Sequence, residues 1–258
     1  MGGRLGMGEG SMKKLLSVLL TLVLSMGLAL PVMAEEAPEP IRFPDVAETH
    51  YAAEAVDWCV SRGVMLGYED GTFRPGAPVT RAQFCVMLAR VFFPEELDRF
   101  EAQAQGQPWY WPSLMALARK GILAGTWWST DDSWRGADDS WRRTEDIWWR
   151  AEDSGNFRVD VGVSRYEMAL LLYNVMARNF ESISLSEQDA ASQRIPDWDR
   201  VPDRYAISVS SVYAAGIITG HADGSFQGGN MVTRAQAAAV VYRLVLYLGV
   251  PMIPVVGV

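Results

Sequence analysis

The sequence has few of the residues from which catalytic and metal centres are built. Its 258 residues include 2 histidines and 2 cysteines, and these four residues show no zinc-binding spacing. Three motifs are absent from the chain: the G-x-S-x-G motif of serine hydrolases, the H-E-x-x-H motif of zinc proteases and a glycine-rich phosphate loop. Carboxylates are plentiful, but no pair stands out as a glycosidase pair. The sequence therefore favours a protein that is not an enzyme and that uses no metal or cofactor.

Basic residues are also scarce, and long apolar runs are limited to one place. The chain has 23 Lys+Arg against 31 Asp+Glu. A net-acidic chain is a poor candidate for binding nucleic acid. The apolar run from Leu15 to Leu30 follows Lys13 and Lys14 and precedes Ala34. That order is typical of a secretory signal peptide with cleavage after Ala34.

We therefore expect residues 1–34 to be a signal peptide and residues 35–42 to be a linker. The alternative is a membrane anchor, but the run is barely long enough to span a bilayer, and a polar, proline-rich segment follows it. Cleavage would remove three basic residues and one acidic residue, which leaves 20 basic and 30 acidic. We expect a secreted protein with no stable membrane span. Export permits a disulfide between Cys59 and Cys85, and two buried free thiols are the alternative.

The chain contains three copies of one unit, which we place at residues 43–94, 95–179 and 195–247, followed by a tail at 248–258. Copy one reads Gly-Val-Met-Leu-Gly-Tyr-Glu-Asp-Gly-Thr-Phe at 63–73 and Val-Thr-Arg-Ala-Gln at 79–83. Copy three repeats this pattern at 216–226 and 232–236 with the same spacing. Copy two is weaker, because its loop carries an insertion at 126–153. Self-similarity of this kind indicates a repeat architecture.

Each copy is predicted to fold as helix, loop, helix. The first helix shows apolar residues at helical spacing and ends at a glycine, which is Gly63, Gly121 or Gly216. The second helix opens with a capping box, in which a Ser or Thr is followed three residues later by Gln or Glu. These boxes are Thr80 with Gln83, Ser164 with Glu167, and Thr233 with Gln236. One helix pair cannot bury its apolar face alone, so we predict an all-α fold with a shared core.

These motifs resemble the S-layer homology family. Copy one matches it nearly throughout, from Phe43-Pro-Asp45 through the loop at 67–73 to the helix start at 80–83. Copy three has Ile195-Pro-Asp197 as its opening element, whereas copy two has no recognisable one. The resemblance implies a three-lobed module with pseudo-threefold packing. It also implies binding of secondary cell-wall polysaccharides, often pyruvylated, in grooves between lobes, to which the opening Asp and the helix-start Arg contribute.

The residues themselves also indicate an anion site. Arg81, Arg165 and Arg234 each stand at the first position of a capped helix, where a cation is locally unfavourable. A compensating partner is therefore expected beside each guanidinium, and a carboxylate suits its geometry. That carboxylate could belong to a ligand, or it could be Asp45 or Asp197 in a bridge that clips the lobes together. Both arrangements could hold at different lobes.

Other candidate groove residues lie near the same motifs. Asp45 and Asp197 are either ligand groups for sugar hydroxyls or helix caps and turn formers. Tyr51 could line a sugar groove and Tyr68 could stack on a ring, although packing is the default role of a single aromatic residue. The candidate loop glycines are Gly67, Gly71, Gly220 and Gly224.

The insertion at 126–153 is a second, shorter repeat. Trp127, Trp134, Trp141 and Trp148 recur at a period of seven, each followed by a pair of acidic residues. Three interpretations are open: a duplicated loop without a role, an amphipathic flap that packs on the module, or an exposed aromatic surface for a glycan or protein partner. The acidic pairs show no EF-hand spacing.

The sequence thus predicts a protein of the cell wall or cell surface that anchors by binding an acidic or pyruvylated wall polysaccharide. The alternative is a structural, self-assembling envelope protein that tethers a partner through its tryptophan-rich insertion.

Overall fold

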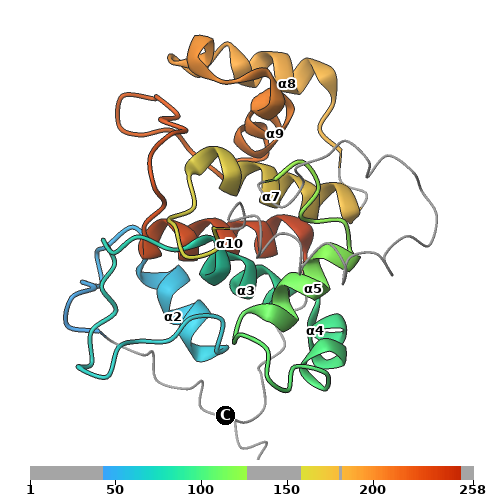
Figure 1. Cartoon of the computed structure of the whole chain (residues 1–258). Helices are drawn as coiled ribbons and strands as arrows, with labels where there is room; N and C mark the ends of the chain where they lie inside the picture. Colours follow the sequence, from blue (N-terminus) through green and yellow to red (C-terminus); the bar gives the residue numbers. More distant parts are fainter. Residues whose placement is uncertain (1–42, 127–157, 180–181, 251–258) are drawn as a thin grey trace, which may run out of the picture. The chain divides into compact units, whose positions relative to one another are not determined.

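The computed structural model describes residues 43–126, 158–179 and 182–250, and its regular structure in these ranges is helical (Figure 1). Within them the chain forms isolated β-bridges and no strand. This agrees with the predicted all-α class. The predicted signal peptide at 1–34, the predicted linker at 35–42 and all of the insertion except Thr126 lie outside the described residues.

The first helices of the three copies are α2 (Ala53–Ser61), α5 (Trp111–Arg119) and α9 (Asp203–Ala214). As predicted, a glycine with positive φ follows each of them: Gly63, Gly121 and Gly216. At the end of α2 the Gly63 amide donates to the Val60 carbonyl, and the Val64 amide donates to the Cys59 carbonyl. The same two hydrogen bonds recur after α5 and α9. They satisfy carbonyls that the helix end would otherwise leave unpaired.

The second helices are α3 (Arg81–Phe92), α7 (Arg165–Arg178) and α10 (Arg234–Leu248). All three predicted capping boxes are present. In each, the Ser or Thr hydroxyl accepts from the backbone amide of the third helical residue, whose side chain accepts from the backbone amide of the capping residue. This reciprocal pair fixes where the helix begins, and so it fixes the position of the arginine that follows the cap.

Each second helix packs on the first helix of a different copy. Helix α3 of copy one packs on α5, α7 of copy two packs on α9, and α10 of copy three packs on α2 (Figure 1). The buried apolar residues form one cluster that draws on all three copies. The sequence predicted a shared core, but it did not show that the partner of each helix belongs to another copy.

Three valines just before the second helices join the copies through the backbone. The Val79 amide donates to Val232, the Val163 amide to Val79, and the Val232 amide to Val163, each at 2.9 Å. The bonds form a closed cycle of copies one, three and two. Because every copy uses a backbone partner from another, none has its hydrogen bonds complete alone.

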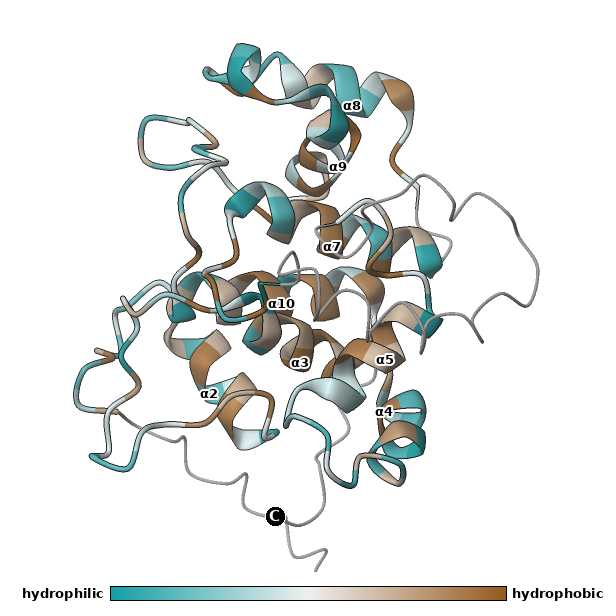
Figure 2. Ribbon diagram, in the orientation of Figure 1, coloured by the Kyte–Doolittle hydropathy of each residue, from teal (hydrophilic) through white to brown (hydrophobic). Residues whose placement is uncertain are grey.

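Two further α-helices among the described residues were not predicted. They are α4 (Pro94–Glu101), which packs on α5, and α8 (Leu185–Ser192), which packs on α9. Both carry many hydrophilic residues (Figure 2). Glu96 holds α4 in place, because its carboxylate lies 3.2 Å from Arg119 and 3.0 Å from Lys120. Burial raises the pKa of Glu96, but these cations outweigh it and lower the pKa overall.

The opening element of copies one and three is tied to the loop by its aspartate. The Asp45 carboxylate accepts from the backbone amides of Phe73 and Arg74 at 2.9 and 2.7 Å. Asp197 does the same for Phe226 and Gln227, at 2.6 and 2.9 Å. Neither carboxylate caps a helix, so the helix-cap alternative is wrong and these residues act as long-range turn formers.

These contacts hold the loop in a shape that few residues adopt. Arg74 and Gln227 have φ values of 56° and 50°, which are unfavourable for residues with a Cβ. The adjacent Phe73 and Phe226 side chains are fully buried, and they anchor the loop in the core. Gly220 leaves no room for a side chain, because a Cβ would lie 2.4 Å from the Gly224 carbonyl oxygen.

We expect the aspartate contacts to make stability depend on pH in the acid range. Burial raises the pKa of Asp45 and Asp197, but the loop amides outweigh it and lower both pKa values overall. A lowered pKa in the folded state stabilises the protein above the unfolded value of about 3.9, and this contribution is lost as the pH falls through the folded pKa. At pH 7 the urea midpoint of Asp45→Asn/Asp197→Asn should therefore be lower than that of wild type. The two midpoints should converge below about pH 4, and a difference independent of pH would contradict the assignment.

The two cysteines are buried as free thiols. Burial raises the pKa of the Cys59 thiol to about 12, and it raises the pKa of Cys85 as well. Both are therefore protonated and unreactive at neutral pH, as in the second of the two alternatives from the sequence.

Candidate functional site: two equivalent grooves between copies

Two pockets of the molecule are lined by corresponding residues of copies one and three. The copy-one groove has a volume of about 340 Å3 and is lined by residues 64–68 of the loop and by one face of α3. The copy-three groove has a volume of about 550 Å3 and is lined by residues 218–222 and by one face of α10. The helix residues that line them correspond one to one: Gln83, Val86, Met87 and Arg90 in the first, and Gln236, Ala239, Val240 and Arg243 in the second.

Each groove is assembled from all three copies. The copy-one groove receives Arg234 from copy three and Trp109 from the start of copy two. The copy-three groove receives Arg165 from copy two and Tyr51 from the start of copy one. Trp109 and Tyr51 correspond in sequence, since each precedes the glycine that ends its own first helix by the same number of residues. The grooves are therefore products of the cyclic packing, and a single copy could not form one.

The two groove arginines are fixed by the loop of the neighbouring copy. Arg234 donates through Nε to the Phe73 carbonyl at 2.7 Å and through Nη2 to the Leu66 carbonyl at 2.6 Å. Arg165 donates in the same way to Phe226 at 2.7 Å and to Thr219 at 3.2 Å. Each guanidinium also lies over the ring of the buried phenylalanine, 4.4 Å from Phe73 and 5.0 Å from Phe226. The predicted bridge to Asp45 or Asp197 is not how these arginines clip the copies together.

These two cations have lost much of their water without gaining a carboxylate. Arg165 is 4% exposed, and burial lowers the pKa of both Arg165 and Arg234. Among the residues that the structure describes, neither makes an ion pair, and the residues lining the two grooves include no Asp or Glu. A partly desolvated guanidinium bound only to carbonyl dipoles is a strong site for an incoming anion.

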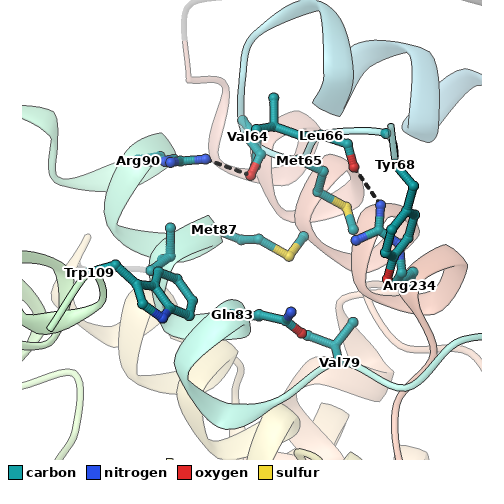
Figure 3. Close-up of a pocket in the computed structure, with 12 residues that line it drawn as sticks. Val64, Met65, Leu66, Tyr68, Val79, Gln83, Met87, Arg90, Trp109 and Arg234 are labelled. Atoms are coloured by element: carbon teal, nitrogen blue, oxygen red, sulfur yellow. Dashed lines mark hydrogen bonds between the residues drawn. The ribbon is translucent and has the colours of Figure 1, made fainter. Parts of the chain in front are cut away.

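The copy-one groove presents its aromatic and basic groups around an apolar floor (Figure 3). Figure 3 shows Trp109 on one side, Arg234 and Tyr68 on the other, and Met87 between them. Arg90 lies at the edge and donates to the Gly63 carbonyl at 2.8 Å. The combination of an apolar floor, ring faces and two cations suits a sugar that carries an acidic group.

The exposed aromatic residues differ in what already covers them. Trp109 and Tyr51 are 65% and 63% exposed. Tyr68 is less exposed, because Arg74 and Arg234 lie 3.9 and 5.0 Å from its ring. His221 takes the place of Tyr68 in the copy-three groove, and its Nε2 has no hydrogen-bond partner among the described residues.

Arg81 of copy one occupies a different environment. It donates through Nη1 to the Arg158 carbonyl of copy two at 3.2 Å, and its Nη2 pairs with the Glu167 carboxylate. Both side chains of this pair are largely buried. The three helix-start arginines thus all donate to a backbone carbonyl of another copy, but among the described residues only Arg81 also meets a carboxylate, that of Glu167 in helix α7.

Several residues that line the grooves were not predicted as groove residues from the sequence. They are Trp109, Arg90, Arg243 and the capping residues Gln83 and Gln236. The signal for Trp109 was its register with Tyr51, and the signal for the two arginines was their shared distance from the capping boxes. Loop glycines Gly67 and Gly220 line the grooves, whereas Gly71 and Gly224 have positive φ and shape the turn beside them.

The described residues contain neither a helix suited to a membrane nor a cluster suited to a metal ion. None of the helices in those ranges combines the length and apolar character that a bilayer crossing requires. No group of three or more His, Cys, Asp or Glu residues within the same ranges is arranged to hold a metal ion.

Comparison with known proteins places the motifs in one family. The family model of the S-layer homology domain matches residues 42–85 and 194–238, which are copies one and three as far as the first turn of their second helices. It does not match the middle copy, although that copy keeps its capping box and its place in the backbone cycle. The match therefore follows the two copies that form the described grooves.

Relatives with curated descriptions align with parts of the chain. An S-layer protein of Bacillus thuringiensis subsp. finitimus is 32% identical over 119 residues, which is 45% of this chain and 14% of that protein. The outer membrane protein SlpA of Deinococcus radiodurans is 45% identical over 82 residues, 31% of this chain and 7% of that protein. An endoglucanase of Bacillus sp. (strain KSM-635) is 24% identical over 236 residues, 90% of this chain and 22% of that enzyme. The chain thus matches only a small part of each relative.

Proposed function

We propose that this chain, in which residues 42–85 and 194–238 are S-layer homology domains, anchors at the bacterial cell surface by binding an acidic wall polysaccharide in its two described grooves. The observation that carries the proposal is the state of Arg165 and Arg234. Each is a partly desolvated guanidinium, held by two carbonyls of a neighbouring copy, and it lines a groove whose lining residues include no Asp or Glu. A carboxylate on the polymer would supply the missing counter-charge.

The fold and the relatives support this proposal in different ways. We infer that the cycle of helix contacts and valine hydrogen bonds makes the chain a three-lobed, pseudo-threefold module. The names of the relatives, an S-layer protein and an outer membrane protein, support a location at the cell surface. The ring faces and apolar floor of the grooves suit a sugar, and a pyruvate ketal on that sugar would present the carboxylate.

We assign three roles to the residues of the two grooves. Arg165 and Arg234 bind the acidic group, while Tyr51, Tyr68 and Trp109 line the sugar. Asp45 and Asp197 are positioning residues, because both oxygens of each carboxylate are used by loop amides. In this function the chain is a binding module without a catalytic role. The protein-docking role of the tryptophan-rich insertion concerns residues outside the described ranges and stays a prediction from the sequence.

The test is sedimentation of the purified protein with cell-wall sacculi. We expect the protein to pellet with intact sacculi and to stay in solution once hydrofluoric acid has stripped the secondary polymer. Equal pelleting before and after stripping would contradict binding to that polymer. The double variant Trp109→Ala/Tyr51→Ala tests whether the protein binds the polymer through the two grooves. Since both side chains are largely exposed, stability should change by less than about 0.5 kcal/mol, while affinity falls by about tenfold or more.

A further inference from the structure

The three equivalent positions between copies differ in charge at two residues. At copies one and three, the third residue of the second helix is neutral, Gln83 or Gln236, and an arginine, Arg90 or Arg243, follows two turns later. At copy two the corresponding residues are Glu167 and Asn174. At the place where the other two copies form a groove, the net charge of copy two is therefore lower by two.

Asn174 keeps the structural part of the arginine's role and drops its charge. Its amide nitrogen donates to the Ile122 and Ala124 carbonyls at 2.8 and 3.0 Å. Arg90 and Arg243 donate to the equivalent segments of their own copies, at Gly63 and Ile217. The hydrogen bonds that hold the loop on the second helix therefore do not require a cation, and the arginines of the other two copies bring a charge that the fold does not need.

Glu167 uses its two carboxylate oxygens for two different purposes. Oε2 accepts from the backbone and the hydroxyl of Ser164 at 2.9 and 3.0 Å, which completes the capping box. Oε1 pairs with Arg81 of copy one. In copies one and three the capping oxygen belongs to Gln83 or Gln236, which accepts from Thr80 or Thr233 at 3.0 Å. The other end of the glutamine is an NH2 group, and it lines the same groove as Arg234 or Arg165.

We propose that Glu167 occupies, on Arg81, the place that a ligand carboxylate takes on Arg234 and Arg165. Among the described residues, the carboxylate-binding grooves then lie at copies one and three, and an internal ion pair lies at copy two. An amide NH2 and a guanidinium are both hydrogen-bond donors, so together they lack an acceptor, which a carboxylate supplies. This inference rests on the proposed function, and it fixes the number of binding sites and the residue that sets their charge.

The experiment is a calorimetric titration of the full chain with a methyl hexoside that carries a 4,6-linked pyruvate ketal. The methyl ester of the same compound is the neutral control. Wild type should bind two equivalents of the acid, and its affinity for the ester should be at least tenfold lower. Gln83→Glu and Gln236→Glu should each leave one site. The double variant should bind the acid no more tightly than wild type binds the ester. Gln193→Glu adds the same charge outside both grooves and should keep two sites.

The variants are expected to fold, since Glu serves as the capping residue in copy two. If thermal unfolding shows that one does not, Arg90→Asn and Arg243→Asn test the same idea, because each copies Asn174 and should weaken its own site by about fivefold or more. Three equivalents bound to wild type, or two equivalents unaffected by the glutamate substitutions, would overturn the inference and leave wall anchoring intact. If wild type neither binds the probe nor sediments with sacculi, the proposed function itself is refuted. Sedimentation without probe binding would overturn the carboxylate assignment alone.

Discussion

Replacing Phe226 with alanine is expected to lower the free energy of unfolding by about 3–5 kcal/mol, the range for truncation of a buried aromatic residue. The Phe226 side chain is fully buried, and its ring stacks on Tyr166 with centroids 5.9 Å apart. Its backbone joins two other segments, because its amide donates to Asp197 and its carbonyl accepts from Arg165. Urea unfolding followed by tryptophan fluorescence measures the effect.

The same variant tests whether the three copies unfold together. One apolar cluster draws on all copies, and each second helix packs on another copy, so the transition should stay single while its midpoint falls. Phe73→Ala is the matched variant in copy one and should cost a similar amount, whereas Phe226→Leu should cost less than half as much. A transition that splits into two steps, or a loss below about 1 kcal/mol, would contradict the shared core.

The features that could be predicted from the sequence are those set by local hydrogen bonds. A capping box needs only four consecutive residues, so Thr80, Ser164 and Thr233 identified their helix starts without knowledge of the fold. A glycine with positive φ after a helix is equally local, which is why Gly63 and Gly216 were placed correctly. Local rules therefore gave the helices that the repeat motifs mark.

The rest depends on contacts between residues far apart in the chain. Helix α8 has a capping box at Ser184 and Glu187, but it carries little apolar periodicity, so it was missed. The partner of Arg165 is a pair of carbonyls in copy three, which no spacing within copy two reveals. Asp45 binds amides that lie in the loop beyond the first helix. In a repeat protein the motifs recur along the chain, but which copy contacts which is decided by packing.

Two grooves on one chain also have a consequence for affinity. A polymer that presents acidic sugars at intervals can fill both grooves at once, and the second contact is then intramolecular. Linked sites of this kind commonly raise the apparent affinity by about 10²–10⁴ over a single site. A module with weak affinity for one sugar could therefore hold firmly to a wall, and losing either groove would remove most of that gain.

The largest effect on wall binding is expected from Arg165→Lys/Arg234→Lys. Lysine keeps the charge, but a single ammonium cannot donate to two loop carbonyls and also form a planar fork with a carboxylate. A charge-assisted hydrogen bond contributes about 1.5–3 kcal/mol, so affinity should fall by at least about tenfold per groove, and sedimentation with sacculi should be lost.

The matched control for this double variant is Arg81→Lys, which alters the arginine that pairs with Glu167. It should lower stability by about 1–3 kcal/mol, because a largely buried pair is weakened, while wall binding stays within twofold of wild type. The outcome separates a binding role from a structural role, since all three arginines connect neighbouring copies. If the three lysine substitutions reduce sedimentation in proportion to the stability they remove, the arginines act only as clamps and the grooves bind the wall by other means. If Arg81→Lys alone abolishes binding, the ligand carboxylate lies at copy two, and the assignment of the grooves is reversed.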